Sequence, residues 1–106
     1  MPHYLFRASY TRQGLEGVMK EGGAGRMAAV KQLVESVGGR FVCGYWAFGE
    51  DDFILIAEAP DNAAAAAAAA TVGLSGAATV HTTVLLTADD IDAAIARRVS
   101  YRAPGA

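Results

Sequence analysis

The sequence predicts an α+β domain whose elements follow the order β-α-β-β-α-β, with one further helix at the C-terminus. Runs rich in aromatic and β-branched residues, typical of strands, lie at residues 3–10, 40–48, 53–58 and 79–86. The segment between the first and second runs has apolar residues at helical spacing, and the segment between the third and fourth contains an alanine tract. The middle gap has only four residues, which suits a hairpin turn.

The length and composition indicate one globular domain. The chain has 106 residues, of which 53% are hydrophobic and 19% charged. We expect residues 1–100 to form the domain and residues 101–106 a flexible tail. The net charge of −2 and the scattered basic residues argue against nucleic-acid binding. The start of the chain does not resemble a signal peptide, and no apolar run has the length of a membrane span. We therefore expect a cytoplasmic protein that does not bind membranes.

The first helical region falls into two parts. Thr11 is the expected N-cap of a short helix, and the glycine-rich residues 22–25 interrupt it. A longer amphipathic helix is expected from Arg26 onward, ended by the glycines at 38–39. Its apolar stripe, at the spacing of one helix face, is Met27, Val30, Leu33, Val34 and Val37.

The second helical region is dominated by alanine. Asp61 is the expected N-cap, and eight consecutive alanines follow at residues 63–70. Alanine is the best helix former, and its small side chain allows close approach to a sheet. Gly73 and Gly76 are expected to end this helix.

A capping-box pattern, Thr87 followed three residues later by Asp90, predicts the start of the last helix. We expect the pair at 97–98, both arginine, to lie at its C-terminal end, where the helix dipole favours positive charge. Its apolar positions are Ile91, Ala94, Ile95 and Val99. The complete order of elements is that of the ferredoxin-like fold.

Apolar residues on both faces of the central strands predict self-association. Helices of this fold cover one sheet face, so the other should be polar if it met water. The terminal helix could cover part of that face; we favour a second copy, giving a dimer or larger oligomer. Alternation assigns the second strand Phe41, Cys43, Tyr45 and Ala47 on one face and Val42, Gly44, Trp46 and Phe48 on the other. In the third strand it assigns Phe53, Leu55 and Ala57 to one face and Ile54 and Ile56 to the other.

A set of short motifs in fixed order resembles the GYD-domain family of small bacterial and archaeal proteins. The resemblance covers residues 4–86, and its motifs are Tyr10-Thr11, Gln13-Gly14, Arg26, Gly38-Gly39, Tyr45-Trp46, Gly49-Glu50-Asp51-Asp52 and Glu58-Ala59-Pro60-Asp61. Asp51 stands where the family's signature turn has tyrosine, and Asp52 matches its aspartate. The resemblance implies a dimeric α/β barrel and no established activity.

The candidate catalytic residues are His81 and Tyr45. Alternation gives His81 one face of the fourth strand and Arg7 one face of the first, its expected neighbour in the sheet. A histidine titrates near neutrality and could act as a general base beside an arginine or tyrosine. The alternative, which we favour, is that His81 is a hydrogen-bonded interface residue. Haem ligation by His81 has no other support in the sequence, so no cofactor is predicted.

No metal site is expected. The acidic residues 50–52 form a turn whose carboxylates should point in different directions into solvent, whereas hard cations need converging oxygens. The histidines and the single cysteine do not have zinc-ligand spacing. The glycine-rich segment before Arg26 lacks the Lys-Ser/Thr of a P-loop, although an anion could bind at that helix start.

One rim of the domain is the expected ligand site. The end of the first strand and two helix starts bring a phenol, a hydroxyl, an amide and a guanidinium together. These groups belong to Tyr10, Thr11, Gln13 and Arg26. The sequence favours a non-catalytic oligomeric module that binds a small molecule or a partner protein. The alternative is a cofactor-independent oxygenase, cyclase or isomerase with an apolar pocket.

Overall fold

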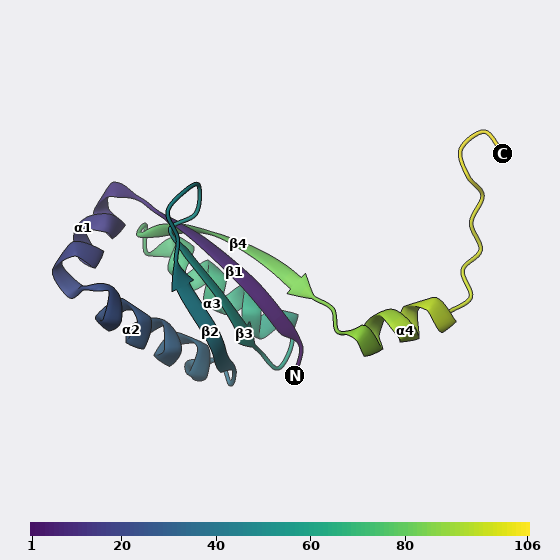
Figure 1. The fold of residues 1–106 in the computed structure, drawn as a ribbon, viewed down its shortest axis with the longest axis horizontal. Helices are drawn as coiled ribbons and strands as arrows, with labels where there is room; N and C mark the ends of the chain where they lie inside the picture. The colour runs from purple at the N-terminus through teal and green to yellow at the C-terminus, as the bar shows by residue number, and fades with distance from the viewer.

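Four strands form one antiparallel sheet in the computed structural model, which describes residues 1–106 (Figure 1). Their order across the sheet is β2-β3-β1-β4, and α1, α2 and α3 lie over one face. The predicted α+β, ferredoxin-like arrangement is confirmed. The strands are β1 (His3–Tyr10), β2 (Arg40–Trp46), β3 (Phe53–Glu58) and β4 (Ala78–Leu85). The helices are α1 (Arg12–Glu21), α2 (Gly23–Ser36), α3 (Asn62–Leu74) and α4 (Ala88–Ala96).

The predicted N-caps start their helices. Thr11 Oγ1 accepts from the Gly14 N–H at 3.1 Å, and Asp61 Oδ1 accepts from the Ala64 N–H at 2.8 Å. Thr87 and Asp90 form both hydrogen bonds of a capping box. Each cap satisfies a backbone N–H that has no partner within its helix.

Three predicted helix boundaries are wrong. Gly22 alone separates α1 from α2, with a φ of 84°, so the glycines at 23 and 25 belong to α2. Gly73 lies within α3, and the positive φ of 76° falls on Gly76 two residues past its end. The helix α4 ends at Ala96, which leaves Val99 outside it. In each case the terminating backbone conformation, not composition, sets the boundary.

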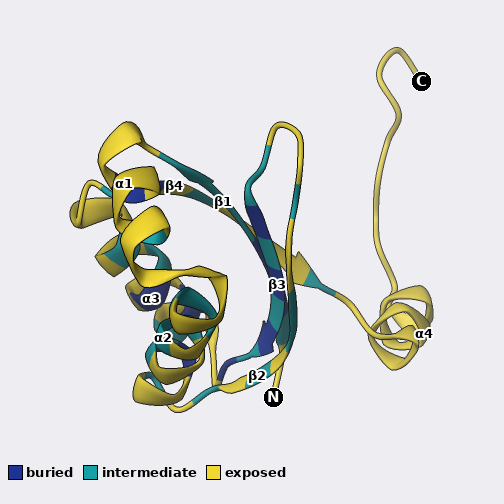
Figure 2. Ribbon diagram, turned by 60° about the vertical axis from the view of Figure 1, so that its left-hand side comes forward, coloured by how far each residue is buried: buried dark blue, intermediate teal, exposed yellow.

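The core lies between the sheet and the helices. Tyr4 and Phe53 are its largest fully buried side chains, and Figure 2 shows buried segments, in dark blue, in the sheet and in the helices beside it. The Tyr4 hydroxyl donates to Asn62 Oδ1 at 2.7 Å. This bond satisfies the polar end of a buried ring and ties β1 to the start of α3.

A β-bulge corrects the expected faces of β2. Phe41 pairs with Ala57, whereas the next paired residue, Cys43, faces Ile56. The extra residue at Val42 shifts the alternation by one position. Phe41 therefore joins Gly44 and Trp46 on the helix-facing side, and Cys43 and Tyr45 lie on the open side.

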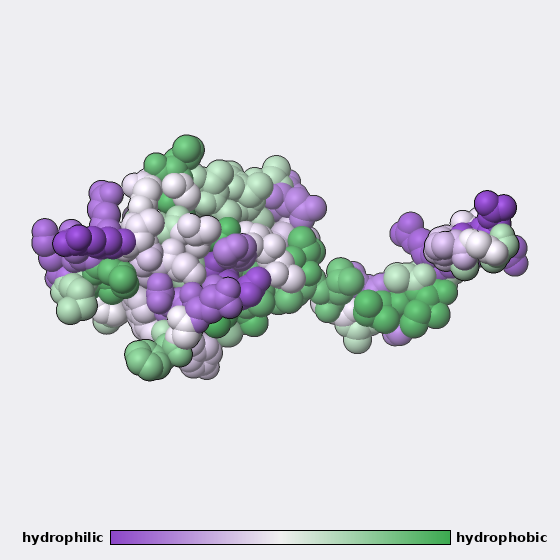
Figure 3. Space-filling view, turned by 90° about the horizontal axis from the view of Figure 1, so that it is seen from above, coloured by the Kyte–Doolittle hydropathy of each residue, from purple (hydrophilic) through white to green (hydrophobic).

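The other face of the sheet is open. Leu5, Ile54 and Ile56 lie half-buried at its centre, on the side opposite to the helices. The terminal helix, which the sequence left as a possible cover, lies away from the sheet in the single chain (Figures 1 and 2). Its Ile95 is 77% exposed, and Figure 3 shows a hydrophobic surface along this arm. None of the helices combines the length and apolar character needed to cross a membrane.

A tight contact at the start of α1 predicts a difference between two of its glycines. A Cβ on Gly14 would overlap the Ala77 carbonyl oxygen, whereas a Cβ on Gly17 would meet no atom within 4 Å. We expect Gly14→Ala to lower the free energy of unfolding by about 2–3 kcal/mol, because backbone must move. Gly17→Ala should raise it by about 0.5–1 kcal/mol, as alanine for glycine does in an exposed helix.

Urea unfolding of both variants at one protein concentration measures this difference. Equal stabilities for the two variants would contradict the close packing of α1 against the segment before β4.

Candidate functional site

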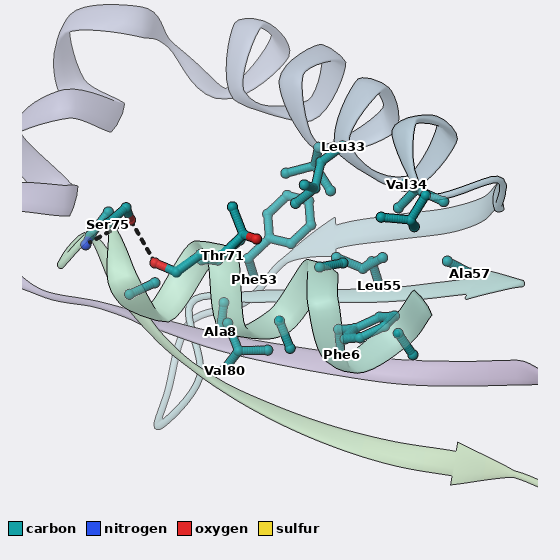
Figure 4. Close-up of a pocket in the computed structure, with 18 of the residues that line it drawn as sticks. Phe6, Ala8, Leu33, Val34, Phe53, Leu55, Ala57, Thr71, Ser75 and Val80 are labelled. Carbon is teal, nitrogen blue, oxygen red and sulfur yellow. Dashed lines mark hydrogen bonds between the residues drawn. The ribbon is translucent and has the colours of Figure 1, made fainter. Parts of the chain in front are cut away.

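A largely apolar cavity of about 310 Å³ lies between the sheet, α2 and α3 (Figure 4). Of its 22 lining residues 18 are hydrophobic, so its walls favour an apolar occupant. The cavity exists because α3 turns alanines inward: Ala65 and Ala68 are buried, yet their side chains are too short to reach α2. Phe6, Phe53 and Leu55 rise from the sheet, and Leu33 and Val34 come from α2.

The polarity of the lining changes along the cavity. Thr71 and Ser75 lie at one end in Figure 4, and Val34 and Ala57 at the other. The Thr71 hydroxyl donates to the Ala67 carbonyl at 2.7 Å, and that of Ser75 donates to the Val72 carbonyl at 2.6 Å. Both hydroxyls are bound to their own helix and can still accept a hydrogen bond.

Tyr10 lies at the polar end and is held on two sides. Its ring stacks on Trp46 with 5.9 Å between centroids, and Trp46 meets Phe53 edge-on at 5.0 Å. Its backbone N–H lies beyond the last pair of the β1–β3 ladder and donates to Asp52 Oδ2 at 2.8 Å. Asp52 thus replaces the missing strand partner and fixes the end of β1. Its own N–H donates to the Ala8 carbonyl at 2.9 Å.

Arg26 is the only residue that brings a charged side chain to the cavity. Its Nη1 lies 3.6 Å from Glu21 Oε2, and both side chains are about one-third exposed, at 34% and 37%. Glu58 also lines the cavity, but its carboxylate binds Arg40 and His3 on the open face of the sheet. The hydrogen bond from Arg40 holds the pKa of Glu58 below its usual value.

The electrostatics of this end centre on the Tyr10 phenol. Burial raises the pKa of Tyr10 above that of an ordinary tyrosine, and the positive charge of Arg26 opposes that rise. The negative charges of Asp52 and Glu21 raise the pKa further. Tyr10 is therefore neutral at physiological pH and can donate a hydrogen bond.

The structure brings together two of the four predicted ligand residues. Tyr10 and Arg26 both line the cavity. Thr11 is an exposed cap whose Oγ1 donates to the Gly76 carbonyl at 2.7 Å, and Gln13 is exposed on α1. Neither of these two lines the cavity.

The candidate catalytic residues lie on the opposite side of the sheet. His81 is exposed on β4, and Tyr45 is 71% exposed on β2. Arg7 is the strand partner of His81, a register that alternation alone does not give, and it forms an ion pair with Asp51 at 3.6 Å. His81 and Tyr45 thus lack access to the cavity, and any role for them belongs to the open face.

The acidic loop folds back onto β1, contrary to the expectation of a solvated turn. Asp51 and Asp52 are half-buried, and the Ser9 hydroxyl donates to the Glu50 carbonyl at 3.0 Å. The bonds of the two aspartates to Arg7 and to the Tyr10 N–H direct them to opposite sides of the strand. No group of three or more acidic, histidine or cysteine side chains in the structure is arranged to hold a metal ion.

The family model of the GYD domain matches residues 4–95, most of the chain. The chain belongs to the GYD-domain family. No curated protein and no solved structure matches it. In this GYD domain Asp52 closes the end of β1 beside the cavity. Asp51 instead pairs with Arg7 on the open face.

The sequence indicates an apolar pocket only in the enzyme alternative and does not identify the residues that line it. The alanine tract was interpreted as a means of close helix–sheet packing, which holds for Ala65 and Ala68. The same short side chains leave the space towards α2 unfilled. The spacing of Thr71 on α3 and its C-cap Ser75, four residues apart, was the available signal for a polar end. It could be interpreted only once the direction of α3 was known.

The environment of Tyr10 predicts a specific pH dependence. The phenol should ionise above the usual tyrosine value, seen as the part of the ultraviolet titration that Tyr10→Phe removes. Arg26→Gln should raise this pKa further and Asp52→Asn should lower it. Because folded Tyr10 keeps its proton where the unfolded chain loses it, stability should fall as the pH rises past about 10.

The Tyr10→Phe variant should lack this part of the alkaline loss of stability. A Tyr10 titration at or below the ordinary value would contradict its burial beside the cavity.

Proposed function

We propose that this GYD domain is a homo-oligomeric module that binds a small, mostly apolar molecule in the cavity between the sheet, α2 and α3. The observation that carries the proposal is the cavity of about 310 Å³ with one polar end. Protein cores leave few voids larger than a water molecule, whereas ligand pockets begin at about 300 Å³. The cavity is partly open to solvent, so a ligand can enter it, and covering its apolar walls would stabilise the complex.

Binding fits the lining better than catalysis does. Tyr10 and Arg26 supply a hydrogen-bond donor and a charge, but the lining contains no histidine, cysteine or lysine. Its carboxylate, that of Glu58, is bound to partners on the other sheet face. A cofactor-independent enzyme remains the alternative, with neutral Tyr10 as the general acid in place of His81 or Tyr45.

We further propose that a second copy covers the open sheet face. Leu5, Ile54 and Ile56 form an apolar centre there, and burial of such a centre stabilises association. Ion pairs flank it on two sides, Arg7 with Asp51 and Arg40 with Glu58. A two-fold axis brings this face of one copy against the same face of another. Because each face carries both arginines and carboxylates, opposite charges of the two copies can meet.

Filling the cavity should weaken ligand binding without unfolding the domain. N-phenyl-1-naphthylamine, a neutral probe that fluoresces in apolar surroundings, should bind the wild-type chain. Ala68→Leu places a larger side chain on the cavity wall and should weaken probe binding roughly tenfold or more. Loss of one methyl-sized contact with the probe costs about 1 kcal/mol, and exclusion of part of the probe from the cavity costs more. Ala66→Leu, exposed elsewhere on α3, is the matched control and should bind as wild type does.

Probe binding that Ala68→Leu leaves unchanged would place the probe elsewhere and defeat the proposed function. Circular dichroism of both variants checks that α3 is retained.

A charge at the centre of the open face should separate the copies. Ile56 lies between Leu5 of β1 and Cys43 of β2. We expect Ile56→Lys to convert a dimer or larger oligomer into a monomer, because an unpaired ammonium would be buried. Ala28→Lys, on the exposed side of α2, should leave the assembly intact. Native mass spectrometry measures both, and a monomeric wild-type protein at micromolar concentration would reject this interface.

A further inference from the structure

We infer that the ligand of the cavity is an apolar carboxylate, bound with its carboxylate against Arg26 and Tyr10 and its apolar body along the alanine face of α3. This inference rests on the proposed function and adds the chemical class of the ligand. Three features of the cavity support it. The Arg26 guanidinium lies at one end, the Arg26 and Tyr10 donors lack hydrogen-bond partners, and the Glu21 carboxylate of the same chain already pairs with Arg26.

The charge lies at one end of an otherwise apolar space. Arg26 and Tyr10 lie close enough for the guanidinium to act on the phenol, and Tyr10 pairs with Ala78 at the end of β4 near Ser75. The remaining walls are alanine, valine, leucine and phenylalanine side chains. A ligand that matches this lining has one anionic end and an apolar remainder, since a neutral apolar molecule would leave the guanidinium without a new partner and a polar one would leave the walls unsatisfied.

The polar end offers two donors without a hydrogen-bond partner, beside the Thr71 and Ser75 hydroxyls, which donate to their own helix. The Tyr10 hydroxyl makes no hydrogen bond within the chain, and the Arg26 guanidinium forms only its 3.6 Å ion pair with Glu21. The acidic group next to Tyr10, Asp52, is occupied by the Tyr10 backbone N–H. A phenol and a guanidinium together suit a carboxylate, which accepts several hydrogen bonds at once.

Glu21 shows that a carboxylate fits this guanidinium. It comes from the last residue of α1, is 37% exposed, and can turn into solvent when another carboxylate arrives. Glu21 should therefore compete with the ligand. This competition gives the inference a signature that a merely structural role of Arg26 would not produce, because removal of Glu21 should strengthen binding while removal of Arg26 weakens it.

Octanoate and octanol, which share the apolar chain and differ in the head, test the assignment. Isothermal titration at neutral pH should show octanoate binding the wild-type chain roughly tenfold or more tightly than octanol, the value of a charge-assisted hydrogen bond. Arg26→Gln should reduce octanoate to the affinity of octanol and leave octanol unchanged. Glu21→Gln should tighten octanoate binding. Arg12→Gln, whose side chain is 95% exposed on α1, is the matched arginine control and should change neither affinity.

The fluorescence of Trp46 gives a second readout. It is the single tryptophan of the chain and stacks on Tyr10. Octanoate should change its emission in the wild-type protein and not in Arg26→Gln.

Two failures are distinguishable. If N-phenyl-1-naphthylamine binds in an Ala68-dependent way but octanoate and octanol bind equally, or Arg26→Gln leaves octanoate affinity unchanged, the carboxylate assignment is wrong and the binding cavity stands. If the probe, octanoate and octanol all fail to bind, the proposed function and this inference are both rejected.

Discussion

The alanine face of α3 is the constraint on which the architecture of this GYD domain depends. A helix of eight successive alanines forms readily, because alanine loses no side-chain entropy, and it can lie close to the sheet. The same side chains cannot extend sideways to α2. The two helices therefore lie over one sheet face with a space between them, and Phe6, Phe53 and Leu55 form its floor. The short alanine side chain is thus the cause both of the strong helix propensity of α3 and of its weak packing against α2.

The polar end of that space depends on the junction between β1 and α1. Thr11 caps the helix, Gly14 permits close approach to Ala77, and Asp52 accepts the last N–H of the strand. All three fix the backbone on either side of Tyr10, so its ring has little freedom to leave Trp46. Asp52 therefore acts on the backbone of Tyr10 and does not itself line the cavity.

Most of the fold could be predicted because local patterns determine it. The caps at Thr11, Asp61 and Thr87 follow from hydrogen bonds three residues apart, and each is present. The bulge at Val42 could not be predicted, because an extra residue in a strand leaves the composition unchanged and alters only the register. The fold-back of Asp51 and Asp52 depends on Arg7 and Tyr10, more than 40 positions away, and has no local sequence signal.

The candidate site was predicted in part for the same reason. The ends of neighbouring elements bring Tyr10 and Arg26 together, as their positions at a strand end and a helix start indicated. Whether each side chain points into the space or into solvent depends on helix rotation, which separated Thr11 and Gln13 from the other two. His81 and Tyr45 could be assigned to a face by alternation, but not to the cavity or away from it.

The detached position of α4 has a consequence for the dynamics of the chain. This helix has nine residues and, apart from its capping box and the first-turn Asp89, little that stabilises it locally. Isolated helices shorter than about 12 residues are marginal in water. In a single chain the backbone amides of α4 should therefore exchange with solvent orders of magnitude faster than those of β1 and β3, and a protease should cut the arm without unfolding the sheet. The arm is a separate cooperative unit, whose order reports directly on whether another surface holds it.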